Sequence, residues 1–129
     1  MNSVIIGVGS NIKPRQNIKK AKILLAQNLK ILAQSRFLTT KPFGKTNQAN
    51  FINGAILIET SLKVEELRNH LKGIEQVLGR NTSANKEFGA RTIDLDILVW
   101  NEKIVNKDFY ERDFVRNSIL ELLPQLKYS

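Results

Sequence analysis

The chain has 129 residues and a mass of 14.7 kDa, a size that predicts one domain with a hydrophobic core of its own. It contains no cysteine and a single histidine, which excludes disulfides, thiolate nucleophiles, Cys-ligated zinc and histidine metal clusters. The formal net charge is +8, and residues 1–58 carry nine Lys and Arg without one carboxylate. This asymmetry has two possible explanations: a polyanionic ligand, or a purely compositional cause.

The sequence shows no membrane or export signal. No apolar run approaches the length of a membrane-spanning helix, and the beginning of the chain, MNSVIIGVGSN, lacks the features of a secretory signal. We therefore expect a cytoplasmic protein, folded as a single domain over residues 1–129, and we expect it to be a monomer.

The first half of the chain predicts strands around one helix. Residues 3–8 are apolar and β-branched, which indicates a strand. Pro14 suits the first turn of a helix, and apolar residues continue at helical spacing to about Leu32. The segment 36–40 looks extended, and residues 51–59 form a longer predicted strand.

A second amphipathic helix follows. Thr60 or Ser61 offers an N-cap, and acidic residues in the next turn suit the helix dipole. Leucine and isoleucine then recur at helical spacing as far as Leu78, and Gly79 supplies a C-terminal stop.

The last part of the chain completes the expected fold. Residues 80–91 form a polar loop of a length that is often functional, residues 92–100 predict a strand, and residues 117–123 predict a short helix. The order strand–helix–strand–strand–helix–strand predicts an α+β, ferredoxin-like βαββαβ fold, with an antiparallel sheet, both helices on one face and a short C-terminal helix.

The clearest chemical signal is the pair Asp94 and Asp96. Alternation along a strand places both carboxylates on one face, with Ile93, Leu95 and Ile97 facing the core. Like charges this close repel, and Mg²⁺ offsets such repulsion because carboxylates and phosphates are its usual ligands. Two such ions, about 4 Å apart, would suit phosphoryl transfer. The alternative is the polar face of an edge strand.

Basic residues surround this pair in the sequence. Arg80 and Arg91 flank the polar loop, and Lys86 lies inside it. Guanidinium groups suit phosphate oxygens, so the loop resembles a lid over a nucleoside triphosphate. A solvated surface loop is the alternative.

Four motifs together resemble the 6-hydroxymethyl-7,8-dihydropterin pyrophosphokinase family of the folate pathway. They are GVGSN at 7–11, KPFG and QANFIN within 41–53, IE and LGR within 74–80, and FGARTIDLDIL at 88–98. The resemblance implies a ferredoxin-like fold and a reaction that moves the pyrophosphoryl group of ATP to the pterin hydroxymethyl oxygen. It also implies two magnesium ions, with ATP as the co-substrate.

The resemblance further implies roles for single residues. Asp94 and Asp96 match metal ligands, and Asp96, Arg80 and Arg91 match catalytic positions. The implied ATP-binding residues are Lys72, Glu75, Lys86, Arg91, Ile97 and Arg112. On periodicity alone, Glu75 is nearly as easily explained as a surface residue.

The implied pterin-binding residues are Thr40, Pro42, Phe43, Phe51, Asn53, Phe88 and Phe114. The amide of Asn53 can both donate to and accept from the edge of a heterocycle. An ordinary strand-edge asparagine is the alternative for Asn53, and plain core packing is the alternative for Phe51. His70 matches no functional position, and we expect a surface or boundary residue there.

One segment departs from the family pattern. Members usually carry a Pro-His segment that contacts ATP after this strand, whereas no Pro or His occurs between Leu98 and Phe114. This leaves open a degenerate relative that binds a pterin or nucleotide without turnover. A nucleic-acid-binding ferredoxin-like module is a further alternative, and the absence of the expected strand aromatics argues against it.

Overall fold

The computed structural model describes residues 1–41, 49–79 and 92–129. Its elements are β1 (Asn2–Ser10), α1 (Pro14–Asn28), β2 (Lys30–Gln34), β3 (Leu38–Thr40), β4 (Phe51–Thr60), α2 (Val64–Val77), β5 (Asp94–Trp100), β6 (Lys103–Ile104), α4 (Asp108–Glu111) and α5 (Asp113–Leu122). The predicted order of strands and helices is present, with β2, β6 and α4 in addition.

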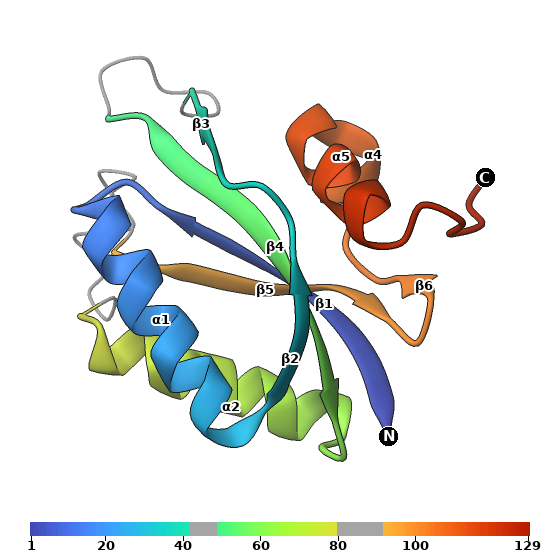
Figure 1. The fold of residues 1–129 in the computed structure, drawn as a ribbon, viewed down its shortest axis with the longest axis horizontal. Helices are drawn as coiled ribbons and strands as arrows, with labels where there is room; N and C mark the ends of the chain where they lie inside the picture. Colours follow the sequence, from blue (N-terminus) through green and yellow to red (C-terminus); the bar gives the residue numbers. More distant parts are fainter. Residues whose placement is uncertain (42–48, 80–91) are drawn as a thin grey trace.

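The strands form one antiparallel sheet in the order β2-β4-β1-β5-β6, and β3 also pairs with β4. The connections through α1 and α2 place both helices on one face of this sheet, while α4 and α5 lie on the other (Figure 1). The expected α+β, ferredoxin-like arrangement with a C-terminal helix is confirmed.

Alternation along β1 divides the hydrophobic core into two layers. Val4 and Ile6 are buried on the side of α1 and α2, whereas Ile5 is buried with Phe109 and Ile119 on the side of α4 and α5. Both faces of the sheet are therefore covered. None of the helices in the described part of the chain has the length and apolar character that crossing a membrane requires.

The predicted extension of the first helix to Leu32 is wrong. Helix α1 ends at Asn28, Leu29 adopts extended backbone, and the chain enters β2 at Lys30. The side chain of Leu29 is nevertheless buried in the same core as the apolar face of α1. The apolar periodicity therefore continues past the helix, because a residue on extended backbone reaches the same core.

The predicted N-cap at Thr60 or Ser61 is also wrong. Thr60 is the buried last residue of β4, and the N-cap position of α2 is Lys63. The backbone N–H of Lys63 donates to Oε1 of Glu66 at 2.8 Å, so a carboxylate inside the helix supplies the cap. The stop at Gly79 agrees with its φ of 92°, which favours glycine.

The C-terminal helix begins at Asp113, four residues before the predicted start at 117. Its buried residues Val115 and Ile119 pack on the sheet. The early start matters for function, because it places the first turn of α5 over the carboxyl-bearing part of β5.

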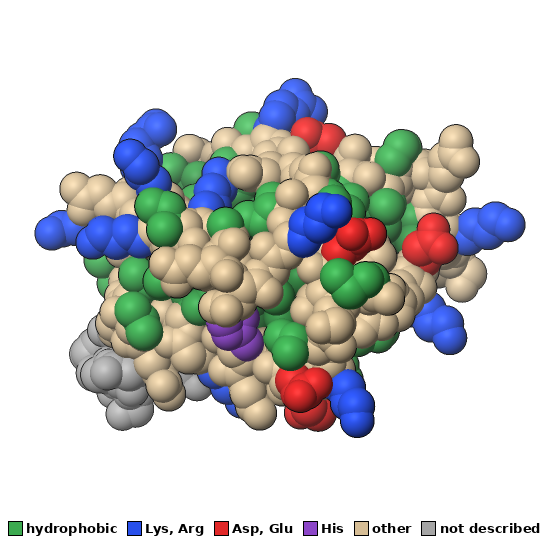
Figure 2. Space-filling view, turned by 60° about the horizontal axis from the view of Figure 1, so that its bottom comes forward, with side chains coloured by type: hydrophobic (Ala, Val, Ile, Leu, Met, Phe, Trp, Pro, Cys, Tyr) green, Lys and Arg blue, Asp and Glu red, His purple; other side chains and the backbone are tan. Residues whose placement is uncertain are grey.

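The positive charge of the first half of the chain gathers on α1. This helix carries four Lys and Arg residues, Arg15, Lys19, Lys20 and Lys22, and its first turn has no acidic residue. Figure 2 shows Lys and Arg side chains at the left end of the molecule, where α1 begins, without Asp or Glu among them on that face.

We expect Ile119→Ala to lower the free energy of unfolding by about 2–5 kcal/mol, because it leaves a cavity between α5 and the sheet where Ile119 is fully buried. Urea unfolding measures the effect, and Leu38→Ala is the control because Leu38 is exposed. Equal losses in the two variants would show that α5 does not depend on this packing.

Candidate active site

Two glycines on the central strand β1 form the floor of the candidate site. Gly9 pairs with Asn53 on β4 and with Asp94 on β5, and Gly7 pairs with Asp96. The residues that alternate with these glycines are buried against α1 and α2, so both glycines face the side of α4 and α5. Asp94 and Asp96 therefore lie on one side of β1 and Asn53 on the other, with the Asn53 amide over Gly9 and the Leu98 side chain over Gly7.

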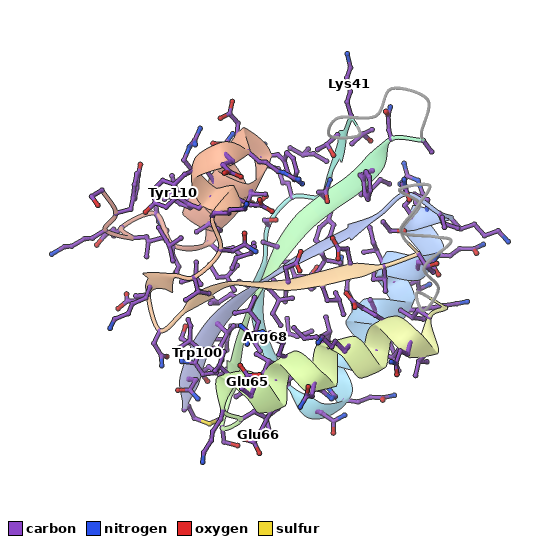
Figure 3. The ribbon with its side chains drawn as sticks, turned by 180° about the vertical axis from the view of Figure 1, so that it is seen from behind. Lys41, Glu65, Glu66, Arg68, Trp100 and Tyr110 are labelled. Carbon is purple, nitrogen blue, oxygen red and sulfur yellow. The ribbon has the colours of Figure 1, made fainter. Side chains whose placement is uncertain are left out.

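This floor belongs to a pocket between the sheet and α5. The pocket brings together five of the predicted site residues: Asn53, Asp94, Asp96, Arg112 and Phe114. They come from β4, from β5, from the junction of α4 and α5, and from α5. Trp100 lies at the other end of β5, beside the start of α2 (Figure 3).

The two aspartates face the pocket as the alternation predicts. Ile93, Leu95 and Ile97 are buried with α1 and α2, which leaves Asp94 half-buried and Asp96 exposed on the opposite face. Two residues along a strand separate equivalent atoms by about 6.8 Å. Two carboxylates at that spacing can hold one hard cation each, or share cations with a phosphate chain.

Glu75 holds the strand between these aspartates. Its side chain is 8% exposed, and its Oε2 accepts a hydrogen bond from the backbone N–H of Leu95 at 2.8 Å. The alternative of a surface glutamate is therefore wrong. Because Leu95 lies between Asp94 and Asp96, this contact fixes β5 from behind the pocket.

Three of the residues predicted to bind ATP do not line this pocket. Glu75 and Ile97 are buried on the side of α1 and α2, and Lys72 is exposed on α2. Six further selected residues lie outside the described part of the chain: Pro42, Phe43, Arg80, Lys86, Phe88 and Arg91.

Asn53 is fixed by two neighbours. Its Nδ2 donates to Oγ1 of Thr40 at 2.5 Å, which joins two residues selected for pterin binding. A Cβ on Gly9 would lie 2.3 Å from Oδ1 of Asn53, so the amide rests directly on the backbone of β1. Phe51 pairs with Thr40 and, by alternation, faces the same side as Asn53. Lys41, the next residue along, points away from the sheet in Figure 3.

Arg112 is oriented by a carboxylate that the sequence analysis missed. Its Nε lies 3.8 Å from Oδ1 of Asp108, and its backbone N–H donates to the Asp108 carbonyl at 2.9 Å. Asp108 itself lines the pocket. The available signal was its position four residues before Arg112, a spacing at which opposite charges meet on a helix.

The segment between Leu98 and Phe114, which lacks Pro and His, begins with a tight hairpin. Asn101 and Glu102 both have positive φ, and the chain reverses directly from β5 into β6. Ser3 donates from its backbone N–H to Oδ1 of Asn101 at 2.8 Å, and the Asn101 N–H donates to the Ser3 carbonyl at 2.7 Å. These bonds tie the turn to β1 and direct the following residues back towards α5.

No group of three or more His, Cys, Asp or Glu suited to a metal ion occurs in residues 1–41, 49–79 and 92–129. The pocket therefore offers the pair Asp94 and Asp96, with oxygen donors and no nitrogen or sulfur ligand from histidine or cysteine. Such a pair fits Mg²⁺, which is usually held through one or two carboxylates together with substrate phosphates.

Comparison with known proteins identifies the family. Residues 5–124 match the family described as 7,8-dihydro-6-hydroxymethylpterin-pyrophosphokinase (HPPK). The chain belongs to this family. The match covers the glycine floor, the two aspartates and the segment that contains Arg112 and Phe114, and it confirms the resemblance drawn from the motifs.

Curated relatives agree with this assignment. The 2-amino-4-hydroxy-6-hydroxymethyldihydropteridine pyrophosphokinase of Bacillus subtilis (strain 168) is 34% identical over 137 residues, covering 98% of this chain and 81% of the relative. The protein of the same name from Aquifex aeolicus (strain VF5) is 32% identical over 135 residues, covering 98% of this chain and 83% of the relative.

A longer plant protein contains a similar stretch. The folate synthesis bifunctional protein of Arabidopsis thaliana is 34% identical over 130 residues, which cover 93% of this chain but 27% of the plant protein. The chain thus spans about a quarter of that relative, and corresponds to one part of it.

We expect Glu75→Ala to lower the free energy of unfolding by about 1–3 kcal/mol, because it leaves the buried Leu95 N–H without this acceptor. Glu75→Gln should lose clearly less, because an amide oxygen can accept the same bond. Urea unfolding compares the two. Equal losses in both variants would show that the charge of Glu75, rather than this hydrogen bond, stabilises the fold.

Proposed function

We propose that this chain transfers the pyrophosphoryl group of ATP to the hydroxymethyl oxygen of 6-hydroxymethyl-7,8-dihydropterin, with AMP and the pterin diphosphate as products. The observation that carries the proposal is the single pocket in which Asn53 and the pair Asp94 and Asp96 face each other across Gly7 and Gly9, in a member of the HPPK family. The names of the bacterial relatives support the same reaction.

Asp94 and Asp96 are the residues that would hold magnesium, and we propose two ions shared with the phosphates of ATP. When bound, magnesium neutralises phosphate charge and polarises the phosphoryl oxygens. The carboxylates themselves stay in place because β5 is fixed from behind by Glu75. A cation bound to both carboxylates would offset their mutual repulsion.

The other pocket residues position the two substrates. Asn53, held by Thr40, offers a donor and an acceptor to the edge of a pterin, and Phe114 offers an apolar surface. Arg112, held towards the pocket by Asp108, offers a guanidinium to phosphate oxygens. Positioning and neutralisation of charge supply most of the catalysis in phosphoryl transfer.

Several roles rest on the motif resemblance. We propose that Arg80, Lys86 and Arg91 contact the phosphates of ATP, with Arg80 and Arg91 acting on the reacting group. Lys72, Glu75 and Ile97 belong to the proposed nucleotide side, and Pro42, Phe43, Phe51 and Phe88 to the pterin side. We also propose a monomer that acts in the cytoplasm, as one domain over residues 1–129 and without nucleic acid.

The proposal is tested by incubating the protein with ATP, magnesium and 6-hydroxymethyl-7,8-dihydropterin and measuring AMP and the pterin diphosphate. We expect both products in equal amounts, and none when EDTA is present. Calorimetric binding of the pterin without release of AMP would overturn the enzymatic proposal in favour of a binding protein that has lost turnover.

We expect Asp94→Asn and Asp96→Asn each to lower kcat by at least about a hundredfold, because each removes a negative charge that binds the cation. Circular dichroism and thermal unfolding should show a folded protein. Asp113→Asn is the matched control, since the Asp113 side chain is 85% exposed and its surface ion pair with Arg116 contributes little. Retention of full turnover in either pocket variant would refute the metal assignment.

We expect Gly9→Ala to raise the KM for the pterin by about tenfold or more, while the KM for ATP changes less. The added Cβ would displace the Asn53 amide, which lies within 2.3 Å, and so cost hydrogen bonds to the pterin. The control is Gly73→Ala, because a Cβ on Gly73 meets nothing within 4 Å. Equal effects on both substrates would contradict the assigned place of Asn53.

A further inference from the structure

A second pocket lies on the opposite face of the sheet, between α1 and the edge formed by β3 and β4. Three cationic side chains, Arg15, Lys19 and Lys22, line it from α1, together with Ile18 and the ring of Phe37. Its volume is about 300 Å³, at the lower end of the range for small-molecule sites. We call it the α1 groove.

The cations of the α1 groove form one stripe. Arg15, Lys19 and Lys22 are spaced by four and three residues, so they share a face of the helix over about 10 Å. No carboxylate lines the groove, and none of the three takes part in an ion pair recorded for the described ranges. The groove thus presents a row of positive charge with the length of several linked phosphates.

Lys22 and Phe37 show that the groove is more than a charged surface. The Lys22 Nζ lies 4.2 Å from the centroid of the Phe37 ring, and burial lowers the pKa of Lys22 from its ordinary value. The groove therefore holds a partly desolvated ammonium group at a fixed place. An anion beside it would offset that loss of solvation.

The same ring indicates which kind of anion fits. A Cβ on Gly54 would lie 2.6 Å from atoms of the Phe37 ring, so the ring packs flat against the backbone of β4. The Lys22 ammonium lies over the same ring. Because the ring packs on β4 and has an ammonium group over it, recognition in the groove depends on charge and not on stacking.

We propose that the α1 groove binds a linear polyphosphate chain, as a site separate from the active site. Lysine and arginine suit phosphate oxygens, and the row of cations matches a chain of three or more phosphates. The sheet separates the two sites. Thr39 and Ile52 line the groove, whereas Thr40 and Asn53, their neighbours on β3 and β4, belong to the opposite face.

The test follows backbone amides by ¹H–¹⁵N NMR during titration with sodium tripolyphosphate, with EDTA present so that magnesium does not direct the anion to the aspartates. We expect saturable shifts at Arg15, Lys19, Lys22 and Thr39. In Lys19→Gln/Lys22→Gln, affinity should fall by at least about tenfold. The matched control is Lys20→Gln/Lys103→Gln, which removes the same charge from exposed positions outside the groove.

The outcomes are distinct. Shifts that do not saturate, or an equal loss of affinity in the control, would overturn the proposal, because they indicate attraction to overall charge. Titration with ATP under the same conditions tests whether the nucleoside contributes to binding. Equal affinity for ATP and tripolyphosphate shows recognition of the phosphates alone, whereas tighter binding of ATP shows that the groove binds a nucleotide. A single-stranded oligonucleotide that binds the same amides more tightly than tripolyphosphate would overturn the proposal in favour of nucleic acid.

Discussion

The absence of side chains at Gly7 and Gly9 is the constraint on which the site depends. These residues lie on β1, the strand between β4 and β5, and a Cβ on Gly7 would come within 2.9 Å of the Leu98 side chain. At Gly9 a Cβ would come within 2.3 Å of the Asn53 amide. With hydrogen there instead, the Asn53 amide packs directly on the backbone of β1, and the carboxylates of β5 lie about 10 Å away across that strand. The residues proposed to bind the pterin and the phosphates thereby lie on one surface.

Much of the fold could be predicted because its signals are local. The alternation of Asp94 and Asp96 with isoleucine and leucine determines both their shared face and the burial of their neighbours. The errors occur at element ends, where tertiary contacts decide. Leu29 has the spacing of a helical residue but lies on extended backbone, since β4 offers hydrogen bonds to the residues that follow. The cap of α2 comes from Glu66, inside the helix, and not from the hydroxyl residues before it.

The supports of the site were harder to predict, because their place in the pocket depends on distant parts of the chain. Glu75 reaches Leu95 across 20 residues, and its periodicity in α2 is equally typical of a surface position. Asp108 is a pocket residue only because the turn at Asn101 and Glu102 returns the chain and α4 follows it. Sequence patterns identify the residues that carry chemistry more readily than the residues that hold them in place. The supporting residues mostly depend on contacts between distant parts of the chain.

The arrangement in space also changes the meaning of the net charge. Two cations of the acid-free first half, Lys30 and Arg36, lie near carboxylates of the second half, Glu59 and Glu121. Both contacts are at exposed positions and contribute little to stability. The cations of α1 face a groove without carboxylates, on the side of the sheet away from Asp94 and Asp96. The two proposed phosphate sites therefore lie on opposite faces of the sheet: in one, cations held by carboxylates would neutralise phosphate, and in the other lysine and arginine would do so directly.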